Sequence, residues 1–226
     1  MDYSAKYLDA NRFPNLDGIE AKIITHLIKS ESHYAKDLWR LVKYTTPDAL
    51  SRPELTSEEK RALVFDGTNG QPSATREARV FMAPFVDDAW QEQCSSLYIY
   101  VSGVRPLDRL HAEVVVNIEV VVHSQISVVI GNGDPDLNPD ANPNDSDKEG
   151  NIVVAVKNRA TALVKDVVAE LNGIYLDGVG YLFLEPLKEA KGKVDSKLWN
   201  VRSFYGHTIS MVMGISGVSD SPMTGF

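Results

Sequence analysis

The residues best suited to chemistry are the carboxylates and amides of an acidic segment at 131–150. The segment reads GNGDPDLNPDANPNDSDKEG, and its three prolines and lack of apolar periodicity are typical of a long exposed loop. Calcium takes six to eight oxygen ligands, which alternating Asp and Asn side chains can supply. One interpretation is therefore a calcium site, whose candidate ligands are Asp134, Asp136, Asn138 and Asp140.

The spacing of this segment departs from that of an EF-hand. Pro139 stands where the EF-hand loop needs its invariant glycine, and Asp145 replaces the bidentate glutamate at the twelfth position. Six acids and one lysine lie between Asp134 and Glu149, which is more than half of the net charge of −8. We therefore favour a solvated loop tip, with bound calcium as the alternative. In an assembly, such a tip could face a basic partner or repel DNA.

A pair of neighbouring acids, Asp87 and Asp88, is a second candidate metal site. Paired carboxylates can bind Mg²⁺ in a nuclease, and Glu92 or Asp108 could serve as the third acid. Acids in a solvated turn are the commoner explanation of such a pair. A metal-dependent enzyme that uses these residues is kept as an alternative function.

The remaining reactive side chains match no catalytic pattern. Cys94 has no cationic neighbour that would activate its thiol, so we expect a buried core residue. The five histidines lack the HxH or HxxxH spacing of a metal site, and His123 is expected to be a hydrogen-bonded core or interface residue. The sequence has no Walker A or GxSxG motif, and Gly131-Asn132-Gly133 has no third glycine. We therefore predict that the chain has no catalytic residue and no cofactor, and that it is not an enzyme.

The composition is that of a soluble globular protein. Hydrophobic residues make up 43% and charged residues 24% of the 226 residues, which is sufficient for one large domain with a core. The net charge of −8 argues against a general nucleic-acid binder, which needs basic surface. A single cysteine fits a reducing compartment, and we find no signal peptide or membrane-spanning stretch. We expect synthesis in a cytoplasm and no membrane partner.

The N-terminal part of the chain predicts helices. Apolar residues have helical spacing from Gly18 to Tyr44, and Ser30 or Ser32 is a candidate cap that divides this region into two helices. The run Thr56-Ser57-Glu58-Glu59 predicts a capping box before a short helix that ends near Phe65.

The remainder predicts strands and one further helix. Asn151 is expected to cap a helix over about 152–171, which Gly173 ends. The longest strand, His111–Ile130, has apolar residues on both faces and should be central in a sheet or buried at a subunit interface. Other expected strands are 79–82, 97–101, 198–218 and a hairpin over 174–185 that turns at Asp177-Gly178.

Together these elements predict an α+β fold. The sheet is expected to be mixed or antiparallel with a long central strand, one packed helix at about 152–171 and N-terminal helices. We expect an N-terminal arm at 1–16, a single domain at 17–218 that carries the acidic loop, and a C-terminal tail at 219–226.

Several segments resemble neck or head–tail connector proteins of tailed bacteriophages. The resemblance covers roughly residues 30–130 and includes the Val-rich strand with His123. Its other segments are DLWRLVKY at 37–44, DALSRP at 48–53, LTSEEK at 55–60 and RVFMAPFVDD at 79–88. Proteins of that family form rings that are stacked between the portal and the tail tube. These rings close the head exit after packaging or terminate the tail. The family implies no cofactor and no catalysis.

The resemblance implies a virion protein that forms a six- or twelve-fold homo-oligomeric ring. Its partners would be neighbouring neck, portal-adaptor and tail proteins, and genomic DNA would pass through the channel without specific binding. The expected α+β body favours a tail terminator or neck protein over a portal adaptor, because adaptors are mostly helical. The alternatives are another tail or baseplate component, the metal-dependent enzyme and the calcium-binding module.

Overall fold

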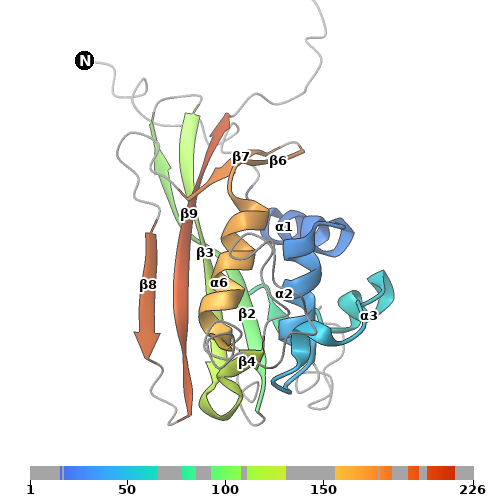
Figure 1. Ribbon diagram of the computed structural model, residues 1–226. Coiled ribbons are helices and arrows are strands. Elements are labelled where there is room, and N and C mark those ends of the chain that lie inside the picture. The colour runs from blue at the N-terminus through green and yellow to red at the C-terminus, as the bar shows by residue number, and fades with distance from the viewer. Residues whose placement is uncertain are drawn as a thin grey trace, which may run out of the picture.

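A long, mixed β-sheet organises the protein, and helices cover one of its faces (Figure 1). The computed structural model describes residues 16, 18–65, 78–84, 93–107, 111–130, 156–177, 179–184, 193–198 and 203–216. The predicted arms lie outside these residues apart from Leu16, and so does the acidic loop 131–150. The α+β class with N-terminal helices is confirmed.

Seven strands form the main sheet. Six of them follow the order β1-β2-β3-β9-β7-β6, and β8 pairs with β9 beside β7. Among the pairings between described strands of this sheet, that of β1 with β2 is parallel and the others are antiparallel. The bounds are β1 Val80–Phe81, β2 Ser95–Pro106, β3 His111–His123, β6 Ile174–Leu176, β7 Gly180–Phe183, β8 Lys193–Leu198 and β9 Phe204–Ser216.

The helices pack on the sheet face that carries the larger core. They are α1 Ile19–Lys29, α2 His33–Lys43, α3 Ser57–Ala62 and α6 Arg159–Leu171, with short 3₁₀ turns η3 Ala49–Ser51 and η4 Ser124–Ile126. Their apolar stripes meet inward-facing valines and isoleucines of β3, for example Val116, Ile118 and Val120. The opposite sheet face has a smaller cluster in which the Phe81 ring stacks on Tyr98 at 4.9 Å.

The central position predicted for the long strand is confirmed, but its predicted length is wrong. β3 pairs with β2 and β9 and ends at His123. The imidazole of His123 accepts a hydrogen bond from the backbone N–H of Gln125, and η4 turns the chain away from the sheet. The apolar pattern continues past this turn because Val129 is also buried, in a second sheet of β4 (Val128–Ile130) and β5 (Val156–Asn158).

The last helix also begins later than expected. Residues 156–158 form β5, and Asn158 rather than Asn151 caps α6, since its side chain accepts from the N–H of Thr161. Val156 fits helical spacing in the sequence, yet it pairs with Ile130 as a strand residue. The predicted end is confirmed, because Gly173 follows the helix with the left-handed φ of 82° that favours glycine.

Several local predictions are confirmed. Ser32 caps α2 by accepting from the N–H of Ala35, and Thr56 with Glu59 forms a capping box before α3, although that helix ends at Ala62. The hairpin of β6 and β7 occurs where it was predicted. Strand β8 was not predicted.

One buried cation joins the helical layer to the end of β3. The guanidinium of Arg159, at the start of α6, is 0% exposed and donates to four backbone carbonyls. The acceptors are Ile126 in η4 at 2.7 Å, Leu41 in α2 at 3.0 Å, and Tyr44 and Thr46 after α2, each at 2.7 Å. Burial lowers the pKa of Arg159 to about 10, so it stays charged at neutral pH.

Glycine is required where β9 approaches β3. A Cβ on Gly206 would overlap the carbonyl oxygen of Val120, a backbone atom that cannot move aside without breaking the strand pairing. We expect Gly206→Ala to lower the free energy of unfolding by roughly 3 kcal/mol. Gly103→Ala in β2 is the matched control, because a Cβ there meets no atom within 4 Å. Urea denaturation of both variants tests this, and equal stability would contradict it.

Removing the Arg159 charge should be more damaging than removing a surface charge. Arg159→Met leaves four carbonyls without this donor, two in buried and two in partly buried hydrogen bonds, and we expect a loss of roughly 3–5 kcal/mol in unfolding free energy. Arg52→Met is the control, because the exposed Arg52 forms a surface ion pair with Asp48. Thermal and urea unfolding should separate the two variants clearly. Similar midpoints would show that the buried guanidinium does not hold these segments together.

Candidate functional site

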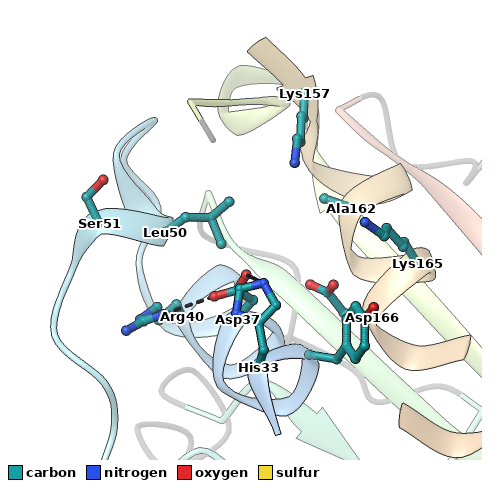
Figure 2. Close-up of a pocket in the computed structure, with 10 residues that line it drawn as sticks. His33, Asp37, Arg40, Leu50, Ser51, Lys157, Ala162, Lys165 and Asp166 are labelled. Atoms are coloured by element: carbon teal, nitrogen blue, oxygen red, sulfur yellow. Dashed lines mark hydrogen bonds and ion pairs between the residues drawn. The ribbon is translucent and has the colours of Figure 1, made fainter. Parts of the chain in front are cut away.

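A pocket of ≈ 280 Å³ opens between the helices α2 and α6 (Figure 2). The turn η3 closes it on one side, and Lys157 of β5 stands at its rim. Its lining consists of His33, Tyr34, Asp37, Arg40, Leu50, Ser51, Lys157, Ala162, Lys165 and Asp166. The size suits a single side chain or a small ligand.

Ion pairs within α2 form one wall of the pocket. Asp37 pairs with Arg40 at 2.9 Å, one turn further along the helix, and with His33 at 3.2 Å. Arg40 also reaches Glu54 at 3.3 Å, and the same carboxylate binds Lys36 at 3.1 Å. The hydrogen bond with Lys36 lowers the pKa of Glu54, and the same bond raises the pKa of Lys36. The charges of this wall are therefore balanced among themselves.

The opposite wall combines two cations with one acid. The ammonium groups of Lys157 and Lys165 and the carboxylate of Asp166 are directed toward the cavity in Figure 2. Lys165 lies 6.0 Å from the ring centroid of Tyr34, within the range of a cation–π contact. Leu50 extends into the space from η3. The arrangement can bind a charged group beside an apolar one.

A cluster of Ser32, Glu170 and His26 resembles a catalytic triad in composition only. A triad places histidine between the serine and the acid, so that it can take the hydroxyl proton. Here the buried Glu170 lies in the middle, since Ser32 donates to one of its carboxylate oxygens and His26 binds the other at 2.9 Å. Ser32 also caps α2. The cluster therefore ties α1, α2 and α6 together, without an activated nucleophile.

A polar row crosses the sheet face opposite the helices. The hydroxyl of Tyr100 in β2 donates to Glu119 in β3 at 2.8 Å, and Ser210 in β9 donates to Asn117 in β3 at 2.9 Å. Asn117 links the two pairs through Tyr100 at 3.5 Å. Burial is the main cause that raises the pKa of Tyr100. This row links the three strands β2, β3 and β9 across that face.

The candidate metal ligands of the sequence lie outside the described residues. This applies to Asp134, Asp136, Asn138 and Asp140 of the calcium interpretation. It applies equally to the acids Asp87, Asp88, Glu92 and Asp108. Within the part of the chain that the structure describes, no group of three or more His, Cys, Asp or Glu could hold a metal ion. Both metal sites remain predictions.

Two other predictions concern residues that the structure describes, and both are confirmed. Cys94 is fully buried, and its sulfur lies 3.6 Å from the hydroxyl of Ser96. His123 is half-buried, accepts a hydrogen bond from Gln125 and meets the edge of the Phe204 ring at 4.9 Å. Both side chains belong to the packing of the second sheet face.

The pocket was not found from the sequence. Its walls come from residues 33–51 and 157–166, which no local motif connects. The one available signal is Arg159, a charged residue beside the core positions Ala160 and Leu163 of a predicted helix. A buried cation at such a position needs several hydrogen-bond acceptors. Arg159 therefore indicates that a chain segment with unpaired backbone carbonyls packs against the start of the helix.

Comparisons give no relative for this chain. None of the helices within the described ranges is long and apolar enough to cross a membrane. No protein-family model, curated protein or solved structure matches the sequence or the fold.

Proposed function

We propose that this chain is a structural subunit of a ring in the neck of a tailed bacteriophage, in a tail-terminator or head-closure position. The ring would have six or twelve copies, contact portal-side and tail-side proteins, and let genomic DNA pass without specific binding. The observation that carries the proposal is an ordered, exposed aromatic surface at one end of the sheet. The sequence resemblance to neck proteins supports it independently.

The aromatic surface consists of Tyr175, Tyr181 and Phe183 on the hairpin β6–β7. Tyr175 is 58% and Tyr181 54% exposed, and their ring centroids are 5.1 Å apart. Phe183 stacks on Tyr181 at 6.0 Å. Leu182, which alternates with them, is fully buried and pairs with Met213 of β9. The hairpin is thus anchored by one face and presents aromatic rings on the other, as protein interfaces do.

A second apolar surface lies on the small sheet β4–β5. Val128, Ile130 and Val156 are each 47% exposed, and the strand register places them on one face. In Figure 1, β4 lies near one end of the long sheet and the β6–β7 hairpin at the other. A subunit that is stacked between other proteins needs contact surfaces on more than one side.

Edge strands offer a further means of association. Among the described strands of the main sheet, β6 and β8 each pair with one neighbouring strand, whereas β1 is also bridged by Val64 on its other side. A neighbouring chain can extend such an edge through main-chain hydrogen bonds. Val194 on β8 is 41% exposed, so this edge also offers apolar contact area.

The location of the protein tests the proposal directly. The parent particle should be imaged by negative-stain microscopy with a label on a C-terminal tag. Label at the head–tail junction is the expected result. Label elsewhere on the particle would assign the chain to the tail or baseplate, and absence from the particle would overturn the structural role.

The aromatic surface should be needed for joining heads to tails. We expect phage made with Tyr175→Ser and Tyr181→Ser together to lose infectious titre by more than about tenfold, because a tyrosine hot spot costs about 2 kcal/mol or more of binding when truncated and about 1.4 kcal/mol is a tenfold change in affinity. Met82→Ser is the control, since this 42%-exposed residue follows β1 at the opposite sheet edge. Free heads and tails are counted by microscopy. Intact particles from both variants would exclude this surface as a contact.

A further inference from the structure

Glu113, near the start of β3, carries a buried carboxylate oxygen that has no hydrogen-bond partner among the described residues. The residue is 5% exposed, and its Oε2 atom accepts no hydrogen bond. Its cross-strand neighbour in β2, Arg105, is exposed and leaves this oxygen unpaired. Burial without a donor is costly for a carboxylate, because it loses its hydrogen bonds to water. Oε2 therefore favours binding of a donor that the described part of the chain does not supply.

The register of the sheet places Glu113 beside the aromatic surface of the β6–β7 hairpin. Glu113 lies opposite Gly214 of β9. On the other side of β9, Phe183 of β7 lies opposite Val212, so Tyr181 comes level with Gly214 on the same face. Glu113 and Tyr181 are thus two strand spacings apart, roughly 10 Å. In Figure 1, the hairpin projects from the end of the sheet at which β3 begins and β9 ends.

The strand between these two residues presents backbone rather than a side chain. Gly214 is exposed, and it has no Cβ. β7 still lies against β9 at this point, since a Cβ on Gly180 would lie 2.5 Å from the carbonyl oxygen of Gly214. A long side chain of a partner can therefore lie across Gly214, with the carboxylate of Glu113 on one side and the ring of Tyr181 on the other.

A carboxylate and an aromatic face both attract a cation. A planar guanidinium donates hydrogen bonds to carboxylate oxygens and stacks on aromatic rings, whereas an ammonium is more strongly hydrated. Tyr181 is 54% exposed, and its ring lies 5.1 Å from that of Tyr175 and 6.0 Å from that of Phe183. The net charge of −8 favours a basic partner over an acidic one. These features together select arginine.

We propose that this end of the sheet binds an arginine side chain of a partner protein, whose guanidinium pairs with Glu113 and stacks on Tyr181. The proposal rests on the aromatic surface being a protein contact, as in the proposed function, but not on a position in the phage neck. It assigns the chemistry of the partner, which is a basic segment that carries an arginine.

The test is a titration of the isotope-labelled full chain with N-acetyl-arginine amide, followed by NMR. We expect saturable shifts of the backbone amides of β6, β7 and the adjoining ends of β3 and β9. N-acetyl-citrulline amide is the matched ligand, because it has nearly the same shape without the charge, and it should bind about tenfold more weakly or worse. Equal affinity for the two ligands, or shifts confined to other parts of the chain, would overturn the proposal.

Two pairs of variants separate the two parts of the site. Glu113→Gln should weaken binding of the arginine amide about tenfold or more. Glu58→Gln, which removes the same charge from an exposed position in α3, should not. Tyr181→Leu keeps an apolar side chain and should weaken binding about threefold, whereas Tyr181→Phe keeps the ring and should bind as the wild type does. Wild-type affinity of the Glu113→Gln variant would overturn the proposal.

Urea unfolding distinguishes a binding role of Glu113 from a structural one. Because Oε2 has no partner among the described residues, Glu113→Gln should unfold at a urea concentration no lower than that of the wild type. A lower midpoint would show that the carboxylate supports the fold, and would overturn the proposal. Imaging of the phage particle tests the neck position separately. Arginine binding by a chain that is absent from the neck would support this site and overturn the neck function alone.

Discussion

The buried guanidinium of Arg159 constrains how the helices pack at the end of β3. A charge removed from water must be fully hydrogen-bonded, and this one takes carbonyls from η4, from the last turn of α2 and from the chain after α2. The carbonyls of Leu41, Tyr44 and Thr46 lie at or just after the C-terminal end of α2, where the helix dipole favours a cation. The three segments must therefore be in place together. Because the walls of the pocket are α2, η3 and α6, the same interaction fixes the pocket's shape.

The sheet depends on β3 in a comparable way. Both faces of this strand are covered, by the helices on one side and by the Phe81–Tyr98 cluster and the Tyr100–Glu119 pair on the other. β9 pairs with β3 along its whole length and then with β8 and β7 in succession on its outer side. The two faces of β3 are thus packed within one chain.

Local chemistry made much of this fold predictable. The Ser32 and Thr56 caps and the left-handed Gly173 were correctly assigned because each depends on a few adjacent residues. The end of β3 was missed, since burial of Val129 in a second sheet extends the apolar pattern. By sequence, Asn151 and Asn158 are equally suitable N-cap residues. The pairing of β4 with β5 places residues 156–158 in a strand, so the helix begins after Asn158. The pocket joins distant segments, so no pattern in the sequence reveals it.

The charge of the chain and its exposed apolar surfaces have opposite effects on association. Subunits of charge −8 repel one another, which keeps random contacts weak. Contacts that bury Tyr175 and Tyr181, or Val128 and Ile130, must overcome that repulsion and do so only in a defined geometry. In the proposed assembly, such a chain would associate where surfaces match and stay dispersed elsewhere.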